Sequence, residues 1–158
     1  MRPITARPHP DADADAVGLL KQTQEHQGYP YGDCVRASYA SLLEIPIKDI
    51  PHFDPRGDQT ASERRWLRQR GLDLVIVPIV EGQPPPEVPD DVYHLVSGWS
   101  PRHPSHGHRV VGKGGAIVWD PHPSRAGLNK LRAFYFVVPL HPERIAKPAH
   151  ARVMKRSR

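Results

Sequence analysis

The sequence has one cysteine, few aromatic residues and no long apolar run. A single cysteine among 158 residues excludes an internal disulfide and a zinc site built from several thiolates. No apolar segment approaches the roughly 20 residues that a membrane-spanning helix needs. The start of the chain also lacks the apolar centre of a secretory signal. We therefore expect one soluble cytoplasmic domain without membrane contact.

Acidic residues are absent from the C-terminal end. The net charge is +5, but the six basic residues after Glu143 leave a net charge of −1 for residues 1–143. These basic residues are Arg144, Lys147, Arg152, Lys155, Arg156 and Arg158. We expect residues 141–158 to form a basic disordered tail, with nucleic-acid contact as the weaker alternative. Residues 1–16 are rich in Pro and Asp and are expected to be a loose extension, so residues 17–140 would form the folded domain.

Two helices and then a run of strands are expected along this domain. A helix over 33–45 would have Asp33 as its N-cap and end at Pro46, and a second over 62–70 would start at Ser62. Segments rich in β-branched and aromatic residues predict strands over 72–80, 92–99, 108–113, 116–120 and 133–140. The "GKGG" turn favours an antiparallel hairpin between the third and fourth strands. This order predicts the α+β class.

The only cysteine, Cys34, lies at the start of the first expected helix. Unpaired backbone N–H groups and the helix dipole favour negative charge there, which lowers the pKa of a thiol. A cysteine that is only a small buried hydrophobe has no reason to lie at that position. The position therefore favours a reactive thiolate over a structural cysteine.

A thiolate nucleophile needs a base, and the base needs an orienting group. His108 begins one expected strand and Asp120 ends the next, so a hairpin would make the two residues neighbours. A strand holds a catalytic group rigidly, which favours His108 over the loop histidines as the base. Those loop histidines are His103, His106 and His122.

A metal site is the alternative use of these histidines. His103, His106 and His108 are closely spaced, and zinc binds imidazole nitrogens. A fourth ligand would have to come from Asp120, His122 or Cys34. No carboxylate or thiol accompanies the histidines at regular spacing, so the metal reading is the weaker one and no cofactor is expected.

Two segments, "GDCVRASYASLLEIPIKDIPHF" and "GHRVVGKGGAIVWDPHPSRAGL", resemble the papain-like cysteine peptidase fold. They look most like phage and prophage proteins related to the bacteriocin-processing (double-glycine leader) peptidases. The resemblance covers about residues 20–140. It implies a Cys-bearing helix packed on an antiparallel sheet, with Cys34 as nucleophile, His108 as base and Asp120 as orienting group.

Papain-like enzymes stabilise the oxyanion with the backbone N–H of the cysteine and an upstream glutamine side chain. The family's usual spacing would place that glutamine at position 28, which is glycine here. Gln22, Gln24 and Gln27 precede Cys34 by 12, 10 and 7 residues. Spacing favours Gln27 and local sequence favours Gln22, so both remain candidates.

The expected function is a cysteine hydrolase that cuts a peptide, amide or isopeptide bond through a thioester acyl-enzyme. Peptide cleavage, deamidation and acyl transfer all fit these residues, and His52 and Trp99 are candidates for lining the substrate cleft. The substrate would be a protein or peptide. The alternative is a catalytically weak binding module of phage origin that engages a host or phage protein.

Overall fold

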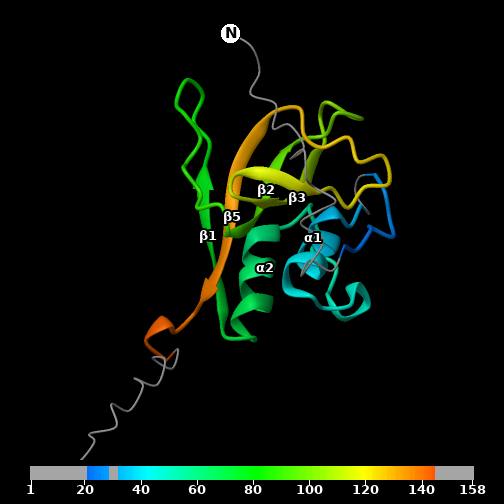
Figure 1. The fold of residues 1–158 in the computed structure, drawn as a ribbon. Helices are drawn as coiled ribbons and strands as arrows, with labels where there is room; N and C mark the ends of the chain where they lie inside the picture. Colours follow the sequence, from blue (N-terminus) through cyan, green and yellow to red (C-terminus); the bar gives the residue numbers. More distant parts are fainter. Residues whose placement is uncertain (1–20, 29–31, 145–158) are drawn as a thin grey trace, which may run out of the picture.

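The computed structural model describes residues 21–28 and 32–144, which form an α+β domain with two α-helices and a five-stranded sheet (Figure 1). The expected extension over 1–16 and most of the basic tail lie outside the described residues. The helices are α1 (Cys34–Leu43) and α2 (Gln59–Arg68), and short 3-10 helices are η2 (Ile47–Asp49) and η3 (Pro142–Arg144). The strands are β1 (Leu72–Pro78), β2 (Tyr93–Trp99), β3 (Gly107–Lys113), β4 (Ala116–Trp119) and β5 (Leu131–Pro139).

The sheet is antiparallel throughout, with the strand order β1-β5-β2-β3-β4. All five expected strands are present, with small differences at their ends. The expected hairpin between β3 and β4 is confirmed, and its turn is made by Gly114 and Gly115. Both glycines have positive φ, 57° and 83°, which suits the two-residue turns that join twisted antiparallel strands.

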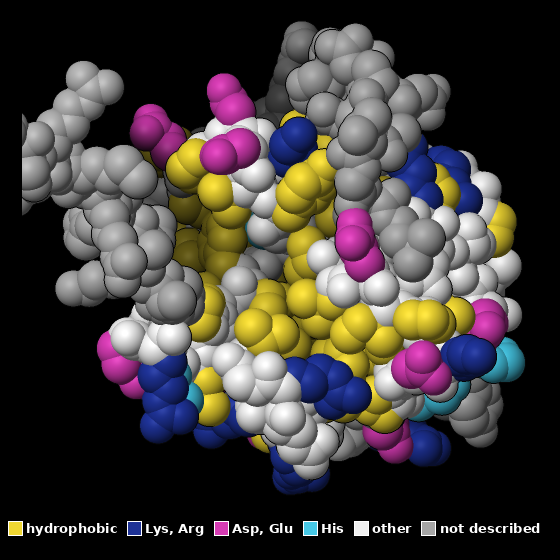
Figure 2. Space-filling view, turned by 60° about the horizontal axis from the view of Figure 1, so that its bottom comes forward, with side chains coloured by type: hydrophobic (Ala, Val, Ile, Leu, Met, Phe, Trp, Pro, Cys, Tyr) yellow, Lys and Arg dark blue, Asp and Glu magenta, His cyan; other side chains and the backbone are white. Residues whose placement is uncertain are grey.

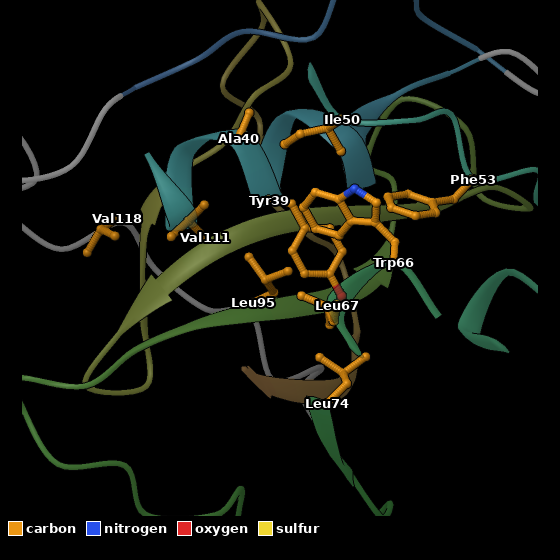
Figure 3. Packing of buried hydrophobic residues seen from close by; sticks show 10 residues of the cluster. All are labelled: Tyr39, Ala40, Ile50, Phe53, Trp66, Leu67, Leu74, Leu95, Val111 and Val118. Carbon is orange, nitrogen blue, oxygen red and sulfur yellow. The ribbon is translucent and has the colours of Figure 1, made fainter. Parts of the chain in front are cut away.

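Both helices pack on one face of the sheet. Tyr39 and Ala40 of α1 and Trp66 and Leu67 of α2 share one buried cluster with residues from four of the strands (Figure 3). The cluster is Tyr39, Ala40, Ile50, Phe53, Trp66, Leu67, Leu74, Leu95, Val111 and Val118. The rings of Tyr39, Phe53 and Trp66 meet at 5.7–5.9 Å between centroids. This core holds the start of α1 beside the sheet.

The other face of the sheet has its own buried cluster, because successive side chains on a strand point to opposite sides. Val110 belongs to this second cluster, whereas its neighbour Val111 belongs to the first. The ring of His94 is fully buried on this side and stacks on Phe134 at 4.8 Å. A side chain at Gly112 would overlap the His94 ring, so glycine is required where β3 passes it.

The surface combines charged and apolar regions. Figure 2 shows one face on which hydrophobic side chains gather around a hollow, with Lys and Arg side chains nearby. Val75 and Val80 are large hydrophobic residues that are about half exposed. Among the described residues, no helix has the length and apolar character needed to cross a membrane.

The start of α2 differs from the expectation. The helix begins at Gln59 instead of Ser62, and the Asp58 carboxylate caps it by accepting from the Ala61 N–H at 2.9 Å. Asp58 satisfies a backbone N–H that has no acceptor within the helix, which is the role expected for Ser62. This earlier start brings Gln59 and Thr60 to the wall of the cavity that contains Cys34.

Candidate active site

Cys34 is the first residue of α1, as the sequence predicts, and it is partly exposed. The buried carboxylate of Asp33 does not cap the helix, contrary to expectation, but accepts from the His26 N–H at 3.0 Å and the Glu25 N–H at 3.3 Å. The Asp33 N–H in turn donates to the His26 carbonyl at 3.2 Å. These hydrogen bonds join Glu25 and His26 to Asp33, the residue that precedes Cys34. The cap is lost because the same oxygens hold this segment in place.

His108 lies on β3 and Asp120 directly follows β4, so the hairpin brings the two side chains together. His108 Nε2 is 2.7 Å from Asp120 Oδ1, and both side chains are almost completely buried. The imidazole also interacts with the Cys34 thiol, through a side-chain hydrogen bond and through its charge. The structure thus brings Cys34, His108 and Asp120 into one hydrogen-bonded chain.

The electrostatics of this chain favour a thiolate and an imidazolium. Burial raises the pKa of the Cys34 thiol, but the hydrogen bond and charge of His108, with help from the Arg109 backbone N–H, lower the pKa below its ordinary value. Burial also disfavours a charged His108, yet the hydrogen bonds to Asp120 and Cys34 raise the pKa of His108 to about 9. The opposed directions of the two shifts match the ion pair that a cysteine nucleophile requires.

Asp120 is held in one orientation by several donors besides His108. Its Oδ1 accepts from the His122 N–H at 2.8 Å, and its Oδ2 accepts from the Gly127 N–H at 2.8 Å. Burial raises the pKa of Asp120, but the hydrogen bond and charge of His108 and these backbone donors lower the pKa below its usual range. Arg125 also donates to the Asp120 carbonyl and to Thr23 Oγ1, which ties the loop after β4 to the segment before α1.

The glutamines are placed differently from the sequence expectation. Gln22 lies at the other end of α1, where its side chain donates to the Ile45 carbonyl at 2.7 Å and accepts from the Ile47 N–H at 2.8 Å. Both ends of the Gln22 amide are therefore used far from the cysteine end of the helix, which corrects the expectation for this residue. Gln27 is exposed and lines the cavity around Cys34.

Gln24 is the glutamine that sequence reasoning passed over. It is 7% exposed, lines the same cavity and donates from Nε2 to the His26 carbonyl at 2.6 Å. That carbonyl also accepts the Asp33 N–H, so the Gln24 amide lies beside the start of α1. Its Oε1 is buried without a hydrogen-bond partner among the described residues. Spacing from Cys34 could not reveal this, because hydrogen bonds between Asp33 and residues 25 and 26 bring the segment that carries Gln24 to the start of α1.

The hydrogen-bonded chain borders a large cavity of about 1730 Å³ at its Cys34 and His108 end. Cys34 and His108 line this cavity, and its walls come from the segment before α1, the start of α2, the end of β2 and the loop before β3. His52 and Trp99, the two candidates for the substrate cleft, both line it. The volume exceeds the roughly 300–1,000 Å³ of small-molecule sites, so the cavity has room for an extended polypeptide.

The loop histidines lie along this cavity but do not form a metal centre. His103 and His106 stack on each other with centroids 3.8 Å apart, and His122 meets His108 edge-on at 6.2 Å. In the part of the chain that the structure describes, no three His, Cys, Asp or Glu side chains are arranged to hold a metal ion. The metal alternative therefore has no geometric support among these residues.

Comparisons with protein families, curated proteins and solved structures gave no match. Function is therefore inferred from the geometry of the site.

Proposed function

We propose that this protein is a papain-like cysteine hydrolase that acts on an amide or isopeptide bond of a protein or peptide. The observation that carries the proposal is the hydrogen-bonded chain from Cys34 through His108 to Asp120, with the thiol at the start of a helix. A thiol nucleophile, a base and an orienting carboxylate are the three parts that nucleophilic catalysis requires. A purely structural cysteine requires neither of the other two.

In the first half of the reaction, the Cys34 thiolate attacks the carbonyl carbon of the scissile bond and a C–S bond forms. The His108 imidazolium gives its proton to the departing nitrogen, the C–N bond breaks and a thioester remains. In the second half, water attacks the thioester while neutral His108 accepts its proton. The C–S bond breaks, the acid product leaves, and the thiolate and imidazolium are restored.

The negative oxygen that develops on the carbonyl needs hydrogen-bond donors. The first backbone N–H groups of α1, including that of Cys34, have no acceptor within the helix. The Gln24 side chain lies beside this helix end and has a second N–H that its bond to His26 does not use. We assign the side-chain part of the oxyanion hole to Gln24, with Gln27 as the exposed alternative.

The decisive test is the rate of Cys34 modification by iodoacetamide as a function of pH, in the wild type and in His108→Ala. We expect the wild type to react well below pH 7, because the imidazolium stabilises the thiolate. In His108→Ala, reactivity should begin only near or above the ordinary pKa of a thiol, about 8.5. Cys34→Ala should remain folded and lose turnover of peptide substrates.

Identical pH profiles in the wild type and His108→Ala would contradict the proposal. So would full turnover in Cys34→Ala. Either result would favour the binding-module alternative, in which the cavity engages a protein without cutting it.

A further inference from the structure

The cavity around Cys34 has an excess of positive charge. Among its lining residues are two aspartates and five arginines. Asp33 is 3.5 Å from Arg36, and Asp54 is 2.9 Å from Arg56, so each aspartate already has an arginine partner. Three lining arginines remain, which are Arg102, Arg109 and Arg132.

These three arginines differ in how far their charge is already compensated. Arg109 is buried and pairs with Glu63 at 2.6 Å, whereas Arg102 is 3.9 Å from Asp120, whose carboxylate already binds His108. Arg132 is exposed, and among the described residues its side chain has Trp99 but no carboxylate as a partner. Its charge is therefore available to a ligand in the cavity.

Arg132 lies over the ring of Trp99. The guanidinium carbon lies 4.8 Å from the centroid of the Trp99 ring, and both residues line the cavity. A guanidinium that is stacked on an aromatic ring keeps its N–H groups free for in-plane hydrogen bonds. Paired in-plane N–H groups match the two oxygens of a carboxylate. The Arg132–Trp99 pair is thus preorganised to bind an acidic side chain.

Resting on the proposed hydrolase, we propose that the cavity selects polypeptide segments with acidic side chains, and that Arg132 on Trp99 binds one of their carboxylates. A protein ligand is favoured over a nucleic acid because Cys34 would attack an acyl carbon, and the nucleic-acid backbone contains none. The size of the cavity also suits an extended chain.

The test uses Cys34→Ala, so that binding is measured without turnover, and two fluorescein-labelled decapeptides. The peptides are identical except that four Glu residues in one are Gln in the other. We expect the acidic peptide to bind about tenfold more tightly by fluorescence anisotropy at low salt, with the preference falling as salt screens the charges. Adding Arg132→Gln should abolish the preference.

The matched control is Arg68→Gln, which removes the same charge from an exposed side chain of α2 that does not line this cavity. It should leave the preference intact. Equal binding of the two peptides would overturn the inference, and so would a preference that survives Arg132→Gln. Tighter, Arg132-dependent binding of a single-stranded oligonucleotide of equal charge would overturn it in favour of a nucleic-acid ligand.

A second measurement separates this inference from the proposed function. Iodoacetate and iodoacetamide alkylate the same thiol, but only iodoacetate carries a negative charge. We expect Arg132→Gln to slow iodoacetate and to leave iodoacetamide unchanged, whereas Arg68→Gln should change neither rate. An unchanged ratio in Arg132→Gln would count against the acidic-substrate inference, whereas the iodoacetamide pH profile alone tests the thiolate.

Discussion

At the scale of single residues, the site depends on how completely Asp120 is held. Its two oxygens accept from His108 and from two backbone N–H groups, so the carboxylate has little freedom to rotate. Its hydrogen bond is the largest effect opposing the burial penalty on a charged His108, and its charge also raises the pKa of His108. The orientation and the charge of Asp120 therefore act together on the imidazole that contacts Cys34.

Asp120→Asn keeps the shape of the side chain but removes its charge. We expect the pKa of His108 to fall from about 9 toward its ordinary value of 6.5. The imidazolium would then stabilise the thiolate less, and the midpoint of Cys34 alkylation should rise by about one pH unit or more. Asp54→Asn is the control, since Asp54 also lines the cavity but pairs with Arg56. A midpoint that does not move in Asp120→Asn would show that the carboxylate has no influence on the ion pair.

Gln24→Ala should separate oxyanion stabilisation from thiol reactivity. Alkylation of Cys34 develops no oxyanion, so its rate should be unchanged, whereas turnover should fall by roughly 10²–10³-fold. Gln22→Ala is the comparison variant, for which the opposite result is expected. It removes two hydrogen bonds at the end of α1 that is far from Cys34, so it should lower the free energy of unfolding but leave turnover unchanged. A greater loss of turnover in Gln22→Ala than in Gln24→Ala would reverse the assignment.

At the scale of elements, a buried polar network joins α1, α2 and β3. Glu63 of α2 accepts from Tyr39 of α1 at 2.7 Å and from Arg109 of β3 at 2.6 Å, and all three residues are buried. Ser38 also donates to the Arg109 carbonyl at 3.0 Å. Since the Arg109 backbone N–H contacts the thiol, the packing of both helices on β3 sets the surroundings of Cys34.

Glu63→Gln should destabilise the fold more than Tyr39→Phe. The first change leaves the buried Arg109 charge without its counter-ion, which costs about 3–5 kcal/mol in comparable buried pairs. The second removes one hydrogen bond to a carboxylate and should cost about 1–3 kcal/mol. Urea denaturation of both variants measures these free energies of unfolding. An equal or smaller loss in Glu63→Gln would mean that the network does not act through the Arg109 charge.

At the scale of the whole molecule, two buried histidines of the sheet have opposite pKa shifts. The pKa of His108 is raised by its hydrogen bonds to Asp120 and Cys34. The pKa of His94 is lowered by burial against Phe134 and Phe136. His94 Nε2 accepts the Gly115 N–H at 3.2 Å, which fits a neutral ring. Charging His94 would therefore work against the fold.

The folded pKa of His94 lies below its unfolded value of 6.5, so the unfolded chain takes up this proton first as the pH falls. The stability that neutral His94 contributes is present above pH 6.5 and is lost below it. We expect the wild type to lose more free energy of unfolding between pH 7 and pH 5 than His94→Gln does. The difference should be at most about 1.4 kcal/mol per pH unit. Parallel curves for the two proteins would contradict this account, and little difference is expected between pH 7 and pH 8.

The sequence alone determined the α+β class, the approximate positions of both helices and five strands, and Cys34, His108 and Asp120 as the residues of the candidate site. These depend on local signals, namely a proline after the first helix, strand segments rich in β-branched and aromatic residues, and a glycine turn, and a hairpin makes His108 and Asp120 neighbours at short sequence separation. Even the missed start of α2 had a local signal, because Asp58 precedes it as a capping residue.

Only the tertiary structure decided which glutamine lies beside the start of α1, what Asp33 binds and which arginine is left without a partner. Gln24 reaches the helix start because Asp33 and His26 exchange hydrogen bonds, while Gln22 is held by residues 23 and 25 positions away. The availability of Arg132 depends on how the other lining charges are paired. Such contacts depend on where a folded chain places residues that are distant in sequence, and spacing does not encode that.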